Sequence, residues 1–324
     1  MEEKKNNLES PENSVLKEKI STEHNIDIGI LKYVNILKET GYSVDSVPEK
    51  GFEITSIPDK LILEEIDRAL STKFIGRNIY HYYSIESTNT RAKEVAIEDK
   101  EGTLVMAEEQ TAGKGRLDKK WLSPLGKGIW ISVVLKPNIN PMKLSPIALL
   151  GAAAIYKALK NMGVDSQIKW PNDIIIKGKK VAGILTESNV ELNMIKYVVM
   201  GIGINVNLDP EDIPEELRNK ATSIKIEEKR SIYRRDLLVN LLDELEKLYL
   251  DFKVKGDISA VIEICRDNSA TIGKKVKVTR GGREKIGTAI DINENGEVIV
   301  EFTDGQVEAI FSGEVAVIGL DGYI

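Results

Sequence analysis

The residues most able to do chemistry lie in two short clusters rich in glycine and cationic side chains. The first is Gly113-Lys114-Gly115-Arg116, which continues through Lys119 and Lys120 to Trp121. The two glycines permit positive φ and let the backbone approach a ligand closely, because no Cβ is in the way. Cationic side chains at fixed positions stabilise a ligand that carries or develops negative charge. This cluster therefore predicts an anion-binding loop.

The second cluster is Lys169-Trp170-Pro171-Asn172-Asp173, and Lys180 and Gly183 follow it closely. A Gly-Lys-Gly-Arg loop alone is most often a flexible, solvated turn. Two such clusters in one chain favour a ligand site over that alternative. The apolar run 103–107 precedes the first cluster and would place it at a strand end, where α/β sheets bind ligands.

Several kinds of site are disfavoured by residue types and spacing. The chain has no P-loop motif, and Gly201-Ile202-Gly203 lacks the third glycine of a dinucleotide fingerprint. Close strand packing and ligand contact both remain open for that glycine pair. Cys265 is the single cysteine, and His24 and His81 are the only histidines, so neither a zinc site nor a nucleophilic triad has support. Cys265 is predicted to be a small buried hydrophobe. Catalysis would rest on positioning and charge stabilisation.

The region 80–270 alternates strand-like and helix-like patterns, joined by several short turns. This alternation predicts an α+β fold in which helices pack against a mixed sheet. The predicted strands are 79–85, 103–108, 128–135, 167–169, 174–176, 181–186 and 197–201, and the predicted helices are 89–97, 144–162 and 233–252.

After Ala270 the pattern changes to short β-runs. These runs are separated by Gly281-Gly282, Asn295-Gly296 and Asp304-Gly305, which are hairpin signals. Their spacing predicts a small β-barrel at the C-terminal end. The runs themselves are 276–278, 288–292, 297–302 and 306–311.

Five motifs, taken in order along the chain, carry a resemblance to the biotin protein ligase family. It covers most of residues 78–324, and the ordered set is far more specific than any one motif. The motifs are Ser87-Thr88-Asn89, the run from Glu109 to Arg116 that ends at Trp121, Lys169 to Asp173, Lys180 to Leu185, and Gly201 to Asn207.

The resemblance implies an enzyme with two half-reactions and with ATP, biotin and Mg²⁺. The biotin carboxylate would attack the α-phosphate of ATP, giving biotinyl-5′-AMP and pyrophosphate. A lysine of an apo biotin carboxyl carrier domain would then attack the mixed anhydride and release AMP. The implied fold is a class II synthetase-like catalytic domain followed by a small SH3-like barrel.

On the matching positions, the resemblance implies catalytic roles for Arg116, Lys180 and Asp173, with Asp173 also the expected Mg²⁺ ligand. The expected biotin-binding residues are Ser87, Thr88, Asn89, Gln110, Lys114, Gly115, Arg116, Lys180 and Gly183. The expected ATP- and adenylate-binding residues are Arg116, Lys119, Trp121, Lys169, Asn172, Asp173, Lys180 and Asn205.

Structural alternatives accompany these assignments. Helix N-capping explains Ser87 to Asn89 without a ligand, since a helical run follows them. Lys180 follows two other lysines in a predicted hairpin turn, where lysines are usually only solvated. The three tryptophans are expected to pack in the core. Lys114 and Lys119 stand where many family members have arginine, so those positions keep the charge and lose the bidentate fork.

The first sixty residues resemble the winged helix-turn-helix of ligases that are also repressors. Residues 26–41 would be the recognition helix and 42–54 the wing, with its turn at 48–51. However, this segment has eight lysines, no arginine and twelve acidic residues, a net charge of −4. Phosphate neutralisation and arginine dominate DNA recognition. A vestigial domain or dimer spacer is therefore favoured over a DNA-binding module.

The sequence as a whole predicts four parts in a cytoplasmic protein. The single cysteine suits a reducing compartment, and neither a signal peptide nor a membrane span is expected. The resemblance implies a homodimer. A lipoate or octanoyl transferase and a pure DNA-binding regulator remain alternative functions. The parts are 1–62 (winged helix), 63–77 (linker), 78–270 (catalytic domain) and 271–324 (barrel).

The cationic loop is also predicted to move. Since an acyl-adenylate hydrolyses readily, water has to be excluded once it forms. A loop that repels itself when empty and is neutralised by phosphate suits this task. Residues 113–121 are therefore expected to fold over the ligand.

Overall fold

The computed structural model describes residues 28–39, 42–47, 51–56, 59–117, 119–255, 257–280, 283–311 and 316–319. The chain divides into two compact units, Met1–Lys60 and Leu61–Ile324. Some sequence predictions lie outside the described residues: both ends of the expected recognition helix, the wing turn at 48–50, and the Gly281-Gly282 turn.

The first unit contains helix α2 (Ile28–Glu39) and an antiparallel hairpin of β1 (Ser43–Val47) and β2 (Gly51–Ser56). Val34, Tyr42 and Val44 are its buried apolar residues. A helix followed by a two-stranded hairpin thus occupies the segment predicted as recognition helix and wing.

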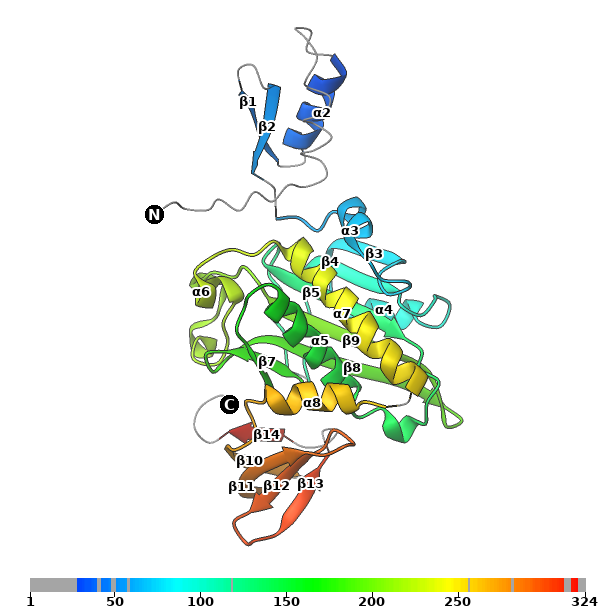
Figure 1. Ribbon diagram of the computed structural model, residues 1–324, viewed down its shortest axis with the longest axis vertical. Helices are drawn as coiled ribbons and strands as arrows, with labels where there is room; N and C mark the ends of the chain where they lie inside the picture. The colour runs from blue at the N-terminus through cyan, green and yellow to red at the C-terminus, as the bar shows by residue number, and fades with distance from the viewer. Residues whose placement is uncertain are drawn as a thin grey trace. The chain divides into compact units, whose positions relative to one another are not determined.

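A seven-stranded sheet forms the centre of the second unit (Figure 1). Its strand order is β3-β4-β5-β9-β8-β7-β6. Only β3 and β4 pair in parallel, so the sheet is mixed, as the sequence predicts. The strands are β3 (Ile79–Ile85), β4 (Leu104–Gln110), β5 (Gly128–Leu135), β6 (Gln167–Lys169), β7 (Asp173–Ile176), β8 (Lys179–Glu191) and β9 (Met194–Asn205).

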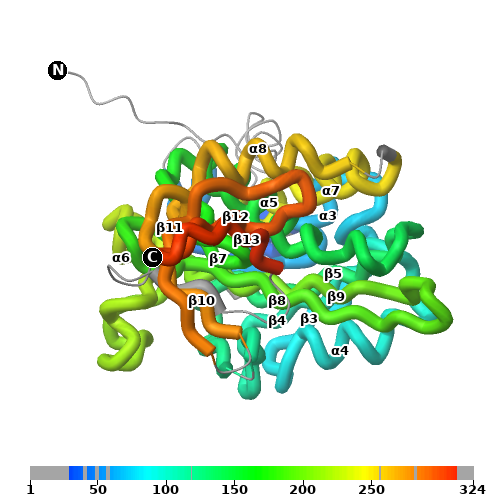
Figure 2. Tube along the Cα trace, turned by 90° about the horizontal axis from the view of Figure 1, so that it is seen from below, coloured from blue at the N-terminus to red at the C-terminus, as the bar shows by residue number. Residues whose placement is uncertain are grey.

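Helices cover both faces of this sheet (Figure 2). Side chains alternate between faces along a strand. Val105 and Val199 accordingly pack with α4 (Thr88–Val95), while Met106 and Met200 belong to the larger core on the other face. That core also includes α5 (Ile147–Asn161), α7 (Arg234–Lys255) and α8 (Ser259–Asp267).

Short elements connect these parts, and one segment satisfies the length and apolarity needed to cross a membrane. The short elements are η1 (Pro141–Lys143), η2 (Pro210–Asp212), η3 (Glu215–Leu217) and α6 (Ile224–Glu228). The apolar segment is Pro141–Asn161, which includes α5, and 61% of its most apolar window is buried inside the protein. Its burial against α7, α8 and the sheet identifies α5 as a core helix.

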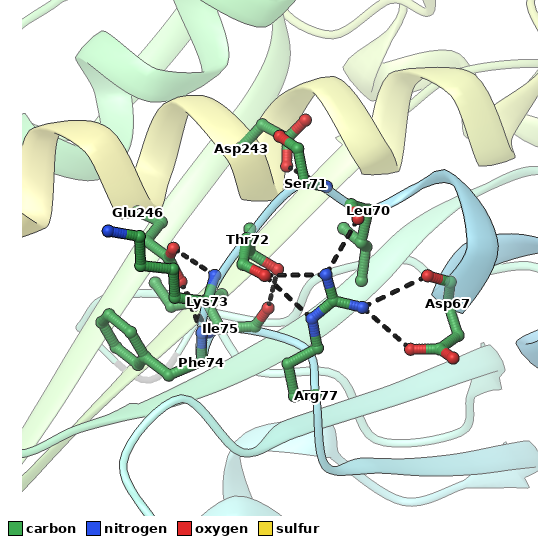
Figure 3. A network of polar contacts seen from close by, with 10 residues as sticks. All are labelled: Asp67, Leu70, Ser71, Thr72, Lys73, Phe74, Ile75, Arg77, Asp243 and Glu246. Atoms are coloured by element: carbon green, nitrogen blue, oxygen red, sulfur yellow. Dashed lines mark hydrogen bonds and ion pairs between the residues drawn. The ribbon is translucent and has the colours of Figure 1, made fainter.

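The segment predicted as a linker, 63–77, packs against the unit that contains the seven-stranded sheet. It contains α3 (Leu63–Ala69), whose Ile66 is fully buried in the main core. The Glu246 carboxylate on α7 accepts backbone N–H bonds from residues 73–75 at 2.5, 2.9 and 2.8 Å (Figure 3). The Arg77 guanidinium donates to the carbonyls of Leu70 and Thr72 and to Asp67. These bonds hold the segment in one conformation.

The C-terminal part is an antiparallel sheet with strand order β13-β12-β11-β10-β14. Its turns at Gly296 and Gly305 have φ of +78° and +80°, which glycine adopts without strain. Trp170 joins it to the catalytic sheet, because its indole N–H donates to the Gly296 carbonyl at 2.9 Å. The strands are β10 (Lys275–Arg280), β11 (Arg283–Ile292), β12 (Val298–Phe302), β13 (Val307–Ile310) and β14 (Ala316–Gly319).

Candidate active site

A cavity of about 590 Å³ lies on the α4 face of the sheet, over a floor made of glycines. Gly201 and Gly203 of β9 share this face with Val199. A Cβ on Gly201 would lie 2.0 Å from Asn89 Oδ1, and one on Gly203 would lie 2.4 Å from Trp121 Nε1. The two glycines therefore make room for side chains that line the cavity, and both glycines also line it, so contact with a ligand stays a prediction.

The structure brings every predicted site residue to this one cavity. Segments more than a hundred residues apart in sequence supply them, so the convergence comes from the fold. The lining includes Ser87, Thr88, Asn89, Gln110, Lys114, Gly115, Arg116, Lys119, Trp121, Lys169, Asn172, Asp173, Lys180, Gly183 and Asn205.

The cationic loop is a tight hairpin. The Gly115 N–H donates to the Lys119 carbonyl at 2.7 Å, and the Trp121 N–H donates to the Gly113 carbonyl at 2.9 Å. Lys114 reaches away from the turn and donates to Thr90 Oγ1 at 3.1 Å, which ties the loop to the start of α4. The Lys114 side chain thus connects the loop to α4.

The charged end of the cavity is built from side chains that already pair with one another. Lys180 Nζ lies 2.5 Å from Asp173 Oδ1 and 5.2 Å from the centre of the Trp121 ring. Arg116 Nη1 donates to Asn172 Oδ1 at 2.8 Å. The Asn172 amide in turn donates to the Ile184 carbonyl at 2.9 Å, so its oxygen is directed at Arg116.

Burial disfavours the charged forms of the cations at this end of the cavity. Desolvation lowers the pKa of Arg116, and the nearby Asp173 carboxylate offsets part of that effect. Desolvation also lowers the pKa of Lys169 to about 8; Asp173 opposes the shift, while Lys180 and Lys119 add to it. An anion bound here would favour the charged forms again, because its negative charge replaces the stabilisation that water gives to exposed cations.

The neutral end of the cavity is held by hydrogen bonds. Ser87 caps α4 by accepting the Thr90 N–H, as the capping alternative predicts. Gln110 Oε1 accepts the Thr88 N–H at 2.8 Å, and Gln110 Nε2 donates to Ser123 Oγ at 2.8 Å. Neutral donors and acceptors of this kind suit a neutral polar ligand group.

Two serines of this end escape the sequence analysis. Ser123 forms an isolated antiparallel bridge with Gln110, and its hydroxyl accepts from the Gln110 amide, but no motif in the sequence marks it. Ser132 is fully buried behind the cavity, where its hydroxyl contacts Thr88 and Asn89. Its signal was a single hydroxyl within the otherwise apolar, wholly buried run of β5.

A second feature without a clear sequence signal is the segment after β9. Residues 208–221 contribute Leu208, Asp212, Ile213, Leu217, Lys220 and Ala221 to the lining. Asn205 is buried beside this segment, and its amide donates to the Thr222 carbonyl at 3.0 Å. The segment therefore forms part of the cavity wall.

The tryptophans and the cysteine behave largely as predicted. Trp130 and Trp170 are buried core residues, and Trp121 and Trp170 line the cavity. Burial raises the pKa of the Cys265 thiol to about 12, so it is no nucleophile. The described part of the chain contains no group of three His, Cys, Asp or Glu that could hold a metal ion.

Comparison with known proteins gives consistent matches. Residues 81–205 match the biotin/lipoate A/B protein ligase family, and residues 271–317 match the biotin protein ligase C-terminal domain. The bifunctional ligase/repressor BirA of Bacillus subtilis is 34% identical, covering 88% of each chain, and that of Escherichia coli is 27% identical, covering 89% of this chain and 87% of its own. A biotin protein ligase from Aquifex aeolicus, solved with biotin and ATP, superposes with a TM-score of 0.65 at 28% identity, covering 75% of this chain and 99% of its own.

Proposed function

Because the chain belongs to the biotin protein ligase family, we propose that its glycine-floored cavity is where biotin is activated and transferred. The chain is a biotin protein ligase with ATP and biotin as substrates. It converts biotin and ATP to biotinyl-5′-AMP and pyrophosphate, and then passes the biotinyl group to a lysine of an apo biotin carboxyl carrier domain, which releases AMP.

One observation carries the assignment of residues. Cationic side chains from three separate segments, Arg116, Lys169 and Lys180, line a single cavity whose other end is neutral and polar. Such an arrangement matches a substrate pair with a neutral ring at one end and an anionic reaction centre at the other. A lipoyl group has no polar ring to use the neutral end, so biotin is favoured over lipoate.

In the first half-reaction, two anions have to meet. Arg116 and Lys180 hold the biotin carboxylate and the α-phosphate together and stabilise the charge that develops at phosphorus. Lys169 and Lys119 hold the remaining phosphates, and Trp121 and Asn205 support the adenylate. The hydrogen bond from Arg116 to Asn172 orients the guanidinium before the ligand binds.

In the second half-reaction, the carrier lysine needs to lose a proton. Once Lys180 has turned to phosphate, its Nζ no longer occupies the position 2.5 Å from Asp173 Oδ1, which opens room for the incoming amine. Asp173 then orients the incoming amine and accepts its proton as the amine attacks the anhydride carbonyl. The bond from that carbonyl to the phosphate oxygen breaks, and AMP leaves.

The donor set fits a magnesium ion that arrives with the nucleotide. Mg²⁺ in nucleotide sites is held by one or two carboxylates, substrate phosphates and water. Asp173 is the carboxylate proposed to contact the ion, and it also pairs with Lys180. When bound, the ion would neutralise charge on the phosphates.

We extend the proposal to the domain organisation. The first unit, Met1–Lys60, is a winged helix-turn-helix, and 271–324 form an SH3-like barrel, in keeping with the C-terminal antiparallel sheet. Because α3 and residues 70–77 pack on the catalytic sheet, the catalytic domain extends from Leu61 to 270 and the linker is shorter than the sequence suggests. The protein is proposed to be a cytoplasmic homodimer.

A second role, as a biotin-responsive repressor, is supported by one observation. The match to the ligase/repressor of Bacillus subtilis covers 88% of this chain, more than the catalytic and C-terminal parts alone account for. The acidic charge of residues 1–60 opposes it. A gel shift on the gene's own promoter, with and without biotin and ATP, decides the question; the absence of a biotin-dependent shift leaves the ligase role alone.

The ligase assignment is tested with the purified protein, ATP and an apo carrier domain. Biotin should add one biotinyl mass to one carrier lysine, and lipoate should add nothing. Peptide mapping by mass spectrometry locates the modified lysine. A lipoyl adduct without a biotinyl adduct would overturn the assignment.

A further inference from the structure

The cationic loop belongs to a longer connection, residues 111–127, which leaves the sheet at the end of β4 and returns to it at the start of β5. The two ends of this connection pair with each other. The Gly126 N–H donates to the Glu108 carbonyl at 3.0 Å, and the Gln110 N–H donates to the Ser123 carbonyl at 3.1 Å. This paired stem, residues 108–110 and 123–128, therefore sets where the cationic side chains of the connection lie.

Arg234, the first residue of α7, binds both halves of the stem. Its Nη1 donates to Glu108 Oε2 at 2.6 Å and to the Gly128 carbonyl at 3.1 Å. One guanidinium nitrogen of this kind carries two N–H groups, so it can serve both acceptors. The Arg234 side chain is 1% exposed and that of Glu108 is 12% exposed. A single buried nitrogen thus joins the strand that enters the connection to the strand that leaves it.

Arg234 also supplies the positive charge that balances Glu108. Glu108 Oε1 accepts the Leu61 N–H at 3.2 Å and lies 3.9 Å from His81 Nε2. Burial lowers the pKa of His81; Glu108 opposes that shift, and Arg234 adds to it. Because the net shift is downward, His81 is neutral at pH 7 and above. The ion pair of Glu108 is therefore with the guanidinium and not with the imidazole.

Stability alone does not account for such a pair. Two charges lose their hydration when they are buried, and an apolar pair of similar volume is often as stable or more stable. A guanidinium adds direction, because its donors lie in a rigid plane. Here the direction is used on the two strands that carry the cationic loop.

We propose that Arg234 and Glu108 are positioning residues for adenylate formation, and that their ion pair holds the two halves of the stem together and so places Arg116 at the cavity. Neither Arg234 nor Glu108 lines the cavity, so both act through the stem. This inference rests on the proposed function, since adenylate formation is the step that Arg116 serves.

The proposal separates turnover from biotin binding. Arg116 stabilises charge that develops in the transition state, so its misplacement lowers kcat. Ser87, Thr88 and Asn89 lie at the start of α4, outside the stem, and they keep their positions when the stem loosens. Loss of the ion pair should therefore lower kcat and leave the KM for biotin near its wild-type value.

The first variant is Arg234→Met in the full-length protein, which removes the guanidinium and keeps an unbranched apolar chain. The kcat of biotin-dependent exchange of pyrophosphate into ATP should fall by roughly 100-fold, the effect expected from a misplacement of about 1 Å. Arg234→Lys keeps the charge without the rigid plane and should recover part of that loss. Trypsin should also cut the free Arg234→Met protein faster at Lys114–Lys120 than it cuts the wild type, with cleavage at Lys253 as the reference.

The double variant Glu108→Gln/Arg234→Met separates positioning from folding. It removes both charges and keeps an acceptor for the Leu61 N–H, so no buried charge is left without a partner. Its thermal unfolding should therefore return towards that of the wild type. Its kcat should stay low, because nothing joins position 108 to the Gly128 carbonyl.

Arg235→Met is the matched control. Arg235 follows Arg234 on the same helix, and it donates to Glu65 on α3 at 2.8 Å, away from the stem. The side chains of that pair are 24% and 12% exposed, so the control removes a partly buried ion pair of similar length. Arg235→Met should keep wild-type exchange.

The outcomes distinguish this proposal from the proposed function. If the wild-type protein shows no biotin-dependent exchange, the proposed function is wrong. If the wild type is active and Arg234→Met has the same kcat, the positioning role is wrong. The role is also wrong if the double variant recovers kcat together with stability, or if the KM for biotin rises as much as kcat falls. The double variant decides the question where Arg234→Met alone does not fold.

Discussion

The two ends of the cavity are pre-organised by opposite means. At the neutral end, buried hydroxyls and amides are locked by hydrogen bonds to one another and to the backbone. At the charged end, buried cations are held by a single carboxylate and an amide, and desolvation lowers the pKa of Arg116 and Lys169. The neutral end gives shape and selectivity, whereas the charged end stores electrostatic strain that an anionic ligand releases.

This contrast predicts where substitutions act. Changes at the charged end should alter the rate of adenylate formation, because that is where charge develops. Changes at the neutral end should alter which vitamin binds. The following predictions test the charged half of that contrast.

The largest expected effect is that of Lys180→Ala. The substitution removes a cation from the phosphate and takes away the Lys180 partner of the Asp173 carboxylate beside it. The biotin-dependent exchange of pyrophosphate into ATP should fall by roughly 1,000-fold. Lys177→Ala, in the preceding turn and paired with Glu227, is the control and should keep wild-type exchange. Wild-type exchange in Lys180→Ala would show that the role is misplaced.

Arg116→Ala should have the next largest effect. It removes the cation that Asn172 orients, so we expect roughly 100-fold slower adenylate formation and faster loss of the adenylate to solution. Retention is measured by trapping released biotinyl-5′-AMP after rapid filtration. Arg116→Lys keeps the charge but loses the bidentate guanidinium, so its rate should lie between those of the wild type and Arg116→Ala. An alanine variant that retains the adenylate as well as the wild type does would contradict this role.

A smaller effect is expected from pH. Lys169 with a pKa of about 8 is cationic below that value and neutral above it. The KM for ATP should therefore rise by about tenfold between pH 7 and pH 9, as the site loses one positive charge. Arginine remains protonated throughout, so Lys169→Arg should flatten the profile. A wild-type profile that shows no inflection near pH 8 would exclude Lys169 as a phosphate ligand.

The smallest effect concerns the cationic loop. Trypsin should cut at Lys114, Arg116, Lys119 and Lys120 in the free protein, and biotin with ATP should slow that cleavage several-fold, as the loop orders over neutralising phosphate. Cleavage is followed by mass spectrometry, with cleavage at Lys253 as the internal reference. Unchanged cleavage would count against closure.

Much of the fold could be predicted because burial leaves a clear pattern. β3 and β5 have the predicted bounds, and β5 is an unbroken apolar run. The β8–β9 hairpin is longer than predicted, since its outer half is polar and lacks the apolar signal. The segment 63–77 was predicted as a linker because its fixation comes from Glu246 on α7, far away in sequence.

The site, like the fold, contains some residues that the sequence predicts and others that it does not. Motif residues such as Arg116 and Lys180 could be predicted, because glycine and charge stand out in a sequence. Ser132 could not, since it belongs to no motif and contacts Thr88 and Asn89 only because the fold brings β5 beside the start of α4.

The Trp170 indole has a consequence for how the enzyme can be divided. Its N–H donates to the carbonyl of Gly296 in the C-terminal sheet, and the backbone N–H of Trp170 donates to Thr271 Oγ1 at 3.0 Å. Removing the last fifty residues would expose one side of a large aromatic ring that lines the cavity with its neighbours Asn172 and Asp173. The C-terminal sheet thus supports the cavity from behind Trp170, and a truncated protein would be a weakened enzyme and not a minimal one.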